Sequence, residues 1–183
     1  MDQLVEIKSK IQINPSRVGK KYFVKTFGCQ MNEHDSERIS GMFELDGMSK
    51  AISEEYADVL FVNTCTIREN ADDKLYGTLG QLKQWKSQKD NRKLLVGGCA
   101  AQKDKELVRE KAPWVDVVIG THNLTNVVDL LNRSEDWGPL TEIIDEIETL
   151  PTEAPSIRES EYSAWVTIQI GCNNSCTFCI VPS

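Results

Sequence analysis

The sequence predicts an α/β protein with a small open parallel sheet and flanking helices. Apolar runs of strand length alternate with segments of helical periodicity over residues 20–135, and this alternation is typical of βαβ units. The run at 58–63 has a continuous apolar centre, as expected for a strand covered on both faces. A region of about 115 residues is long enough for one domain of this class.

Four strands are expected, each an apolar run bounded by polar or turn-forming residues. They cover 21–27, 58–63, 93–97 and 115–119. Because parallel strands are joined by right-handed crossovers, their carboxyl ends should share one edge of the sheet.

Four helices should connect these strands, each with apolar residues at three- and four-residue spacing. They cover 33–46, 68–86, 104–111 and 123–131. Gly47 follows the first helix and Pro113 follows the third, and both residue types are common just beyond a helix end.

The rest of the chain divides by composition. Residues 1–19 are expected to be a loosely ordered tail, and 20–135 form the α/β domain. Residues 136–160 contain three prolines and most of an acidic excess, and they are interpreted as a linker. Residues 161–183 should begin a second domain, with a strand at 164–170.

Location in the cytoplasm is expected. No apolar run approaches the roughly 20 residues that a membrane span needs. The first residues carry scattered charges and lack the apolar core of a secretion signal. In that reducing compartment, the six cysteines are better explained by metal or cluster binding than by disulfides.

The first cysteine set consists of Cys29, Cys65 and Cys99, each one to three residues past the end of a predicted strand. Ligands of open α/β folds bind at the edge where such ends meet. Three thiolates at one edge favour an iron–sulfur cluster. Two alternatives remain: a zinc site completed by His34, and three unrelated buried cysteines, since cysteine is often buried.

The second cysteine set consists of Cys172, Cys176 and Cys179, in one loop after the strand predicted at 164–170. Three thiolates would leave one iron of a 4Fe-4S cluster open to the amino and carboxylate groups of S-adenosylmethionine. Phe178 is a candidate wall against the adenine, or an ordinary core residue. A zinc knuckle is the alternative, although zinc sites more often pair two Cys-x2-Cys units.

A basic stretch at 83–93 contains five cations and Trp85. It could contact phosphate, but a solvated helix face is the stronger interpretation, because most charge runs are of that kind.

These motifs together resemble a known family. The Cys-x3-Cys-x2-Cys loop resembles the signature of radical S-adenosylmethionine enzymes, and the stretches 27–37, 62–68 and 97–102 resemble the methylthiotransferases. Gly-Cys-Gln-Met-Asn at 28–32 is similar to the branch that modifies tRNA. The resemblance covers about residues 20–183, with the motifs in the family's order.

The resemblance implies two 4Fe-4S clusters, one on each cysteine set, with the first involved in sulfur donation. It implies S-adenosylmethionine as cofactor, and methylthiolation of C2 in an N6-isopentenyladenosine beside the tRNA anticodon. The expected partners are the anticodon stem-loop and an electron donor such as flavodoxin or ferredoxin. No membrane partner is expected, and the protein should be a monomer.

Members of this family continue through a whole radical barrel and a small RNA-binding domain, whereas this sequence contains only the first barrel strand and its cysteine loop. The chain is therefore expected to be an N-terminal fragment, since a lone barrel strand cannot bury its faces. No catalytic residue is assigned within it. The alternative function is a catalytically inactive iron–sulfur-binding module of the same family.

Overall fold

The computed structural model describes residues 13–66, 71–145, 155–158 and 160–166. Within them, six strands form one sheet: β1 (Lys21–Thr26), β2 (Ser49–Lys50), β3 (Val59–Thr64), β4 (Lys93–Gly98), β5 (Val117–Ile119) and β6 (Leu140–Glu142). The α-helices are α2 (Gln30–Leu45), α3 (Ala71–Ser87), α4 (Cys99–Asp104), α5 (Leu107–Lys111) and α6 (Val127–Trp137). Two 3-10 helices, η1 (Glu54–Tyr56) and η2 (Thr121–Asn126), complete the elements.

All the strands are parallel, in the order β2-β1-β3-β4-β5-β6. The prediction of an open parallel sheet with flanking helices is thus confirmed. After β2 the chain returns to the other side of β1, so the strand order reverses between β1 and β3. Open α/β sheets bind ligands outside the strand carboxyl ends at such a reversal.

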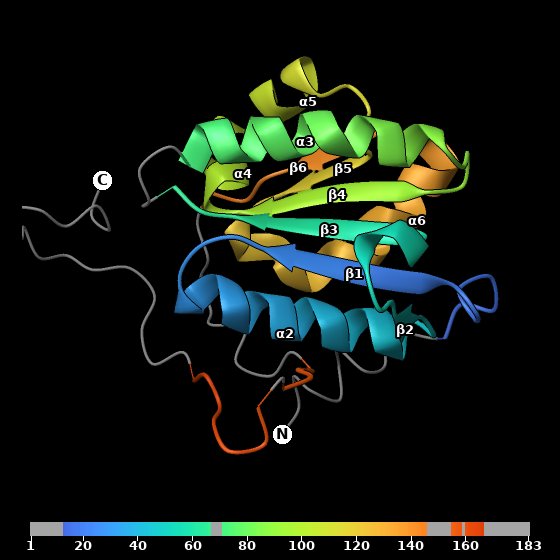
Figure 1. Cartoon of the computed structure of the whole chain (residues 1–183), viewed down its shortest axis with the longest axis vertical. Helices are drawn as coiled ribbons and strands as arrows, with labels where there is room; N and C mark the ends of the chain where they lie inside the picture. The colour runs from blue at the N-terminus through green and yellow to red at the C-terminus, as the bar shows by residue number, and fades with distance from the viewer. Residues whose placement is uncertain (1–12, 67–70, 146–154, 159, 167–183) are drawn as a thin grey trace, which may run out of the picture.

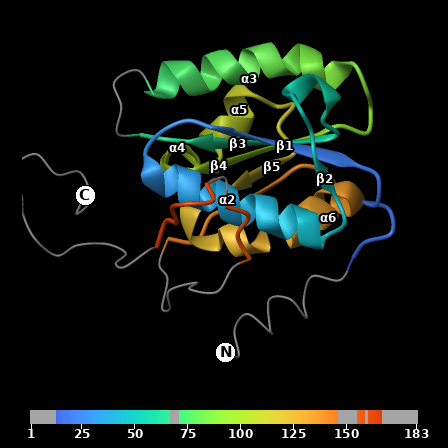
Figure 2. The same cartoon turned by 60° about the horizontal axis from the view of Figure 1, so that its bottom comes forward.

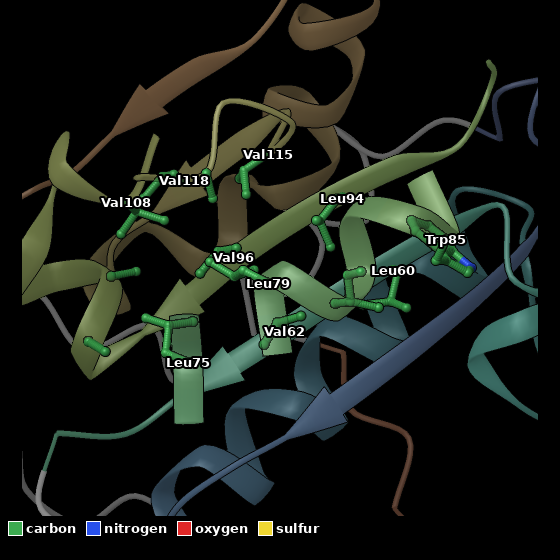
Figure 3. Packing of buried hydrophobic residues seen from close by; sticks show 14 of the residues in the cluster. Leu60, Val62, Leu75, Leu79, Trp85, Leu94, Val96, Val108, Val115 and Val118 are labelled. Atoms are coloured by element: carbon green, nitrogen blue, oxygen red, sulfur yellow. The ribbon is translucent and has the colours of Figure 1, made fainter. Parts of the chain in front are cut away.

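Each face of the sheet is covered by helices, because β3 and β4 are apolar on both sides. Leu60 and Val62 of β3 face one core, together with Leu75 and Leu79 of α3 (Figure 3). Phe61 of β3 faces the other core, which α2 and α6 close from the opposite side (Figures 1 and 2). Because both faces are packed, the central strands hold the residues that follow their carboxyl ends in fixed positions.

Four features differ from the sequence expectations. The helix predicted at 104–111 is broken, because Lys105 has a φ of 49° and separates α4 from α5. Strand β2 was not predicted, and at two residues it is too short for a periodic signal. Strand β6 lies inside the predicted acidic linker and extends the sheet beside β5. In place of the strand predicted at 164–170, residues 164–166 are not in a strand, and 167–170 lie outside the described residues.

A covering segment, defined as residues 155–158, crosses the side of α2 that faces away from the sheet (Figure 1). The N–H of Ile157 donates to the carbonyl oxygen of Glu37 at 3.0 Å. The backbone of Pro155 lies so close to Gly41 that a Cβ there would be 2.7 Å from the Pro155 carbonyl carbon. Glu37, whose carbonyl oxygen accepts the bond from Ile157, is itself buried.

Candidate functional site

The first cysteine set follows the carboxyl ends of three neighbouring strands, β1, β3 and β4. Thr26, Asn63 and Gly97 are register partners across β1, β3 and β4. Cys29 is three residues past this line, and Cys65 and Cys99 are each two residues past it. The fold therefore brings together three cysteines that are 36 and 34 positions apart in the sequence.

Two of these cysteines also begin helices. Cys29 is the N-cap of α2, and Cys99 is the first residue of α4. Cys65 directly follows β3 and is buried, while the other two are partly buried. The three thiols are thus held by the ends of regular elements rather than by long loops.

Glycines let the backbones at this edge approach one another. Gly28 has a φ of 135°, and a Cβ on it would lie 2.7 Å from the Cβ of Cys65. Gly98 has a φ of 91°, and a Cβ on it would overlap the side-chain oxygen of Asn63. Both conformations are in the region that favours glycine. The residues before Cys29 and Cys99 are therefore required to be small for the three chain segments to meet.

A buried polar network joins these segments. The amide of Asn32 donates to the Asn63 side-chain oxygen at 3.0 Å and to the Thr64 carbonyl at 2.7 Å. The amide of Asn63 donates back to the Asn32 carbonyl at 2.7 Å and to Ser36 Oγ at 3.0 Å. Thr64 Oγ1 donates to the carbonyl of Gly97 at 2.6 Å. The network runs from α2 through β3 to β4, the three elements beside the cysteines.

The three thiols also affect one another electrostatically. The pKa of Cys99 is raised to about 11, mainly by burial and then, in decreasing order, by the charges of Cys65, Cys29 and Asp35. Asp35 itself has a pKa raised to about 6, because burial outweighs the opposing effect of Arg38. Asp35 therefore lies near enough to the site to affect Cys99, and its spacing from the cysteines in the sequence gives no signal of this.

A cavity of about 310 Å³ opens beside Cys65. Its lining includes the ends of β1 and β3, with Glu33 from α2 and Lys74 and Leu75 from α3. The site is therefore accessible from the side of the strand-order reversal, between the helices that follow β1 and β3.

Comparison with known proteins fits this arrangement. Residues 21–120, which hold β1 to β5 and the whole first cysteine set, match a family described as "Uncharacterized protein family UPF0004". The chain belongs to this family.

Relatives in the family carry a functional name. The chain is 51% identical over 178 residues, 97% of its length, to a protein of Corynebacterium urealyticum named tRNA-2-methylthio-N(6)-dimethylallyladenosine synthase. It is 57% identical over 163 residues to a protein of the same name from Tropheryma whipplei, and 50% identical over 177 residues to one from Leifsonia xyli. Those two alignments cover 88% and 96% of this chain. The chain spans about a third of the length of each of these relatives, 33%, 34% and 33%.

The donor set of this UPF0004 domain fits an iron–sulfur cluster. Thiolates are the ligands that such clusters use. No group of three or more His, Cys, Asp or Glu side chains in the part of the chain that the structure describes is arranged around a single ion position. Cys29, Cys65 and Cys99 would be the three protein ligands of such a cluster.

His34, the fourth ligand in the zinc alternative, is directed elsewhere in the UPF0004 domain. Its pKa is lowered by burial and by Arg38 and Arg158, and Glu37 opposes that shift. Arg158 belongs to the covering segment, so His34 lies on the outer side of α2. The second cysteine set and Phe178 lie outside the described residues.

The basic stretch at 83–93 is only partly the solvated helix face that the sequence favoured, because Lys83 and Lys89 are exposed whereas Arg92 is buried. Arg92 is only 2% exposed, and its guanidinium lies 4.6 Å from the Trp85 ring centre and donates to the carbonyls of Trp85 and Glu55, each at 2.6 Å. Lys86 pairs with Asp116 at 2.5 Å. Part of this charge therefore stabilises the opposite edge of the UPF0004 domain. In the described residues, no helix is both long enough and apolar enough to cross a membrane.

Proposed function

We propose that the first cysteine set holds a 4Fe-4S cluster, and that the protein carrying this chain methylthiolates C2 of N6-isopentenyladenosine beside the tRNA anticodon. The observation that carries this proposal is the register of β1, β3 and β4, which aligns the three cysteines at the strand-order reversal. The names of the relatives support the substrate class.

The residues of the chain divide into two ligand sets in this proposal. Cys29, Cys65 and Cys99 hold the cluster involved in sulfur donation. The second cysteine set holds the other 4Fe-4S cluster, with S-adenosylmethionine at its open iron and Phe178 beside the adenine. When bound, that cluster supplies the electron that cleaves S-adenosylmethionine to a 5′-deoxyadenosyl radical. The protein acts in the cytoplasm as a monomer and receives electrons from flavodoxin or ferredoxin.

The described residues contribute positioning and shielding. The strand ends fix where the thiolates stand, and Gly28 and Gly98 let the three cysteine-bearing segments approach one another. The cavity beside Cys65 leaves one side of the site open to a substrate. The two hydrophobic cores behind the edge prevent the three strand ends from separating.

A second candidate function is an iron–sulfur-binding module without radical chemistry. The observation that favours it is that the first cysteine set and both hydrophobic cores lie within one domain. Incubating the 183-residue chain with S-adenosylmethionine and a reductant tests whether the chain alone carries out radical chemistry. We expect no 5′-deoxyadenosine from the isolated chain, and appreciable product would exclude the module.

The function of the whole protein can be tested by replacement. In a chimaera, this chain replaces the matching third of the Corynebacterium urealyticum relative. The chimaera is produced in a bacterium whose own enzyme is deleted. We expect mass spectrometry of digested tRNA to detect 2-methylthio-N6-isopentenyladenosine. A Cys65→Ala version is the control and should give none. A soluble chimaera that leaves N6-isopentenyladenosine unmodified would contradict the proposal.

A further inference from the structure

Asn32 and Asn63 are the two most buried polar side chains beside the first cysteine set. Their exposed fractions are 1% and 0%. Burying a side-chain amide is unfavourable unless its hydrogen bonds are made, and an apolar pair of similar volume would avoid that requirement. The amides of Asn32 and Asn63 are therefore expected to do more than fill space in the core.

The network they form is complete on the donor side. Each amide nitrogen has two hydrogens, and each makes two hydrogen bonds. Rotating either amide by half a turn would break both of its bonds, so the orientations are fixed by the network. A fully satisfied buried network is rigid and specifies one arrangement of the backbone segments it joins.

This network touches all three cysteine-bearing segments. The oxygen of Asn32 accepts from Cys29 Sγ at 3.4 Å. Asn63 lies two residues before Cys65. The side-chain oxygen of Asn63 occupies the space that a side chain on Gly98 would need, directly before Cys99. Losing either amide therefore removes hydrogen bonds that hold the cysteine-bearing segments together.

We propose that Asn32 and Asn63 are positioning residues that hold the first cysteine set at the spacing of its iron–sulfur cluster. This inference rests on the proposed cluster. Replacing a residue that orients a metal ligand commonly changes the metal affinity 10- to 100-fold. Asn32 acts on the segment of Cys29, and Asn63 links the segments of Cys65 and Cys99.

The test uses the 183-residue chain with its second cysteine set replaced by alanine, so that iron reports only the first set. Asn63→Asp and Asn32→Asp keep the shape but remove two donors each. Asn63→Ala removes the amide without adding charge, and it also serves if an Asp variant fails to fold. After anaerobic reconstitution, iron release to a chelator and the electron paramagnetic resonance spectrum of the reduced cluster are measured.

Asn123 provides a matched control. It is also 1% exposed, and its amide donates to the carbonyl of Glu142 at 3.0 Å, but it fastens β6 rather than a cysteine segment. Asn123→Asp and Asn123→Ala should lower thermal stability while keeping the parent release rate and spectrum. The Asn32 and Asn63 variants should release iron about 10-fold faster or more, with an altered spectrum.

Equal release rates and unchanged spectra in the Asn63 and Asn123 variants would overturn this inference and leave the cluster intact. A parent chain that binds no iron would instead overturn the proposed function, and the inference with it. The two failures are therefore distinguishable within one experiment.

Discussion

The N–H of Ile157 donates to the carbonyl oxygen of Glu37 at 3.0 Å, so a segment that follows β6 in sequence is fastened to the helix that follows β1. The groove alongside has a volume of about 390 Å³ and is lined by Thr26 and Glu33 at one end and by Trp165 from the far side. The chain beyond the covering segment thus returns to the edge where the first cysteine set lies.

Gly41→Ala should detach the covering segment. A methyl group at this position overlaps the Pro155 carbonyl, which is backbone and cannot rotate away. Hydrogen exchange at the amide of Ile157, measured by mass spectrometry, should become faster than in the parent chain. Gly80→Ala is the control, because it is also within a helix but has nothing within 4 Å. That change should stabilise α3 by about 0.5–1 kcal/mol, and unchanged exchange in Gly41→Ala would contradict the account.

Gly98→Ala should be more destabilising than Gly138→Ala. The two glycines have nearly the same backbone angles, with φ and ψ of 91° and −171° for Gly98 and of 89° and −172° for Gly138. This conformation costs a residue with a side chain about 1–3 kcal/mol. At Gly138 nothing lies within 4 Å, whereas at Gly98 the methyl group also overlaps Asn63 and Thr64. Urea unfolding measures the free energy of unfolding of both variants. Equal losses would show that the neighbours of Gly98 move aside at no cost in free energy.

The stability of the chain should fall as the pH rises from about 4 to about 6. Burial raises the pKa of Asp46 to about 6 despite Arg17 at 3.3 Å, with smaller effects of Glu135 and Lys20. The folded state therefore binds a proton that the unfolded chain has already lost in this range, which favours folding at the lower pH. Asp46→Asn should reduce the fall in the free energy of unfolding between pH 4 and pH 6 by up to about 3 kcal/mol. Asp129→Asn, at an exposed acid, is the control, and equal slopes in the two variants would exclude Asp46 as the cause.

Cys65→Ser should make Cys99 more reactive in the metal-free chain. The pKa of Cys99 is about 11, mainly through burial and next through the charge of Cys65. Removing that charge lowers the pKa and increases the thiolate fraction at pH 9, and the thiolate is the form that reacts with iodoacetamide. Peptide mapping by mass spectrometry follows Cys99 separately from the other cysteines. An unchanged alkylation rate would mean that the two thiols are not close neighbours.

The sequence predicted the parts of the fold that repeat a strong local pattern. Strands β1, β3 and β4 were predicted to within one residue at each end. For β3 and β4 the reason is that buried parallel strands are continuous apolar runs. Strand β6 was not, because Leu140–Glu142 has one apolar residue and owes its strand to pairing with β5. The break at Lys105 was also missed, since a positive φ is uncommon outside glycine and a lysine gives no sign of it in the sequence.

For the site, the sequence could predict which edge the first cysteine set occupies but not how its members are spaced. The edge follows from strand-end placement. The spacing depends on the pairing of Asn63 with Gly97 and on the Asn32 hydrogen bonds, and both are tertiary contacts between residues more than 30 positions apart.

The central claim is that the first cysteine set binds one 4Fe-4S cluster. It is tested most directly by iron and sulfide analysis of the reconstituted chain whose second cysteine set is replaced by alanine. The account predicts about four irons and four sulfides per chain, and none after the further change Cys65→Ala. A single bound metal ion, no iron at all, or iron that persists without Cys65 would contradict it.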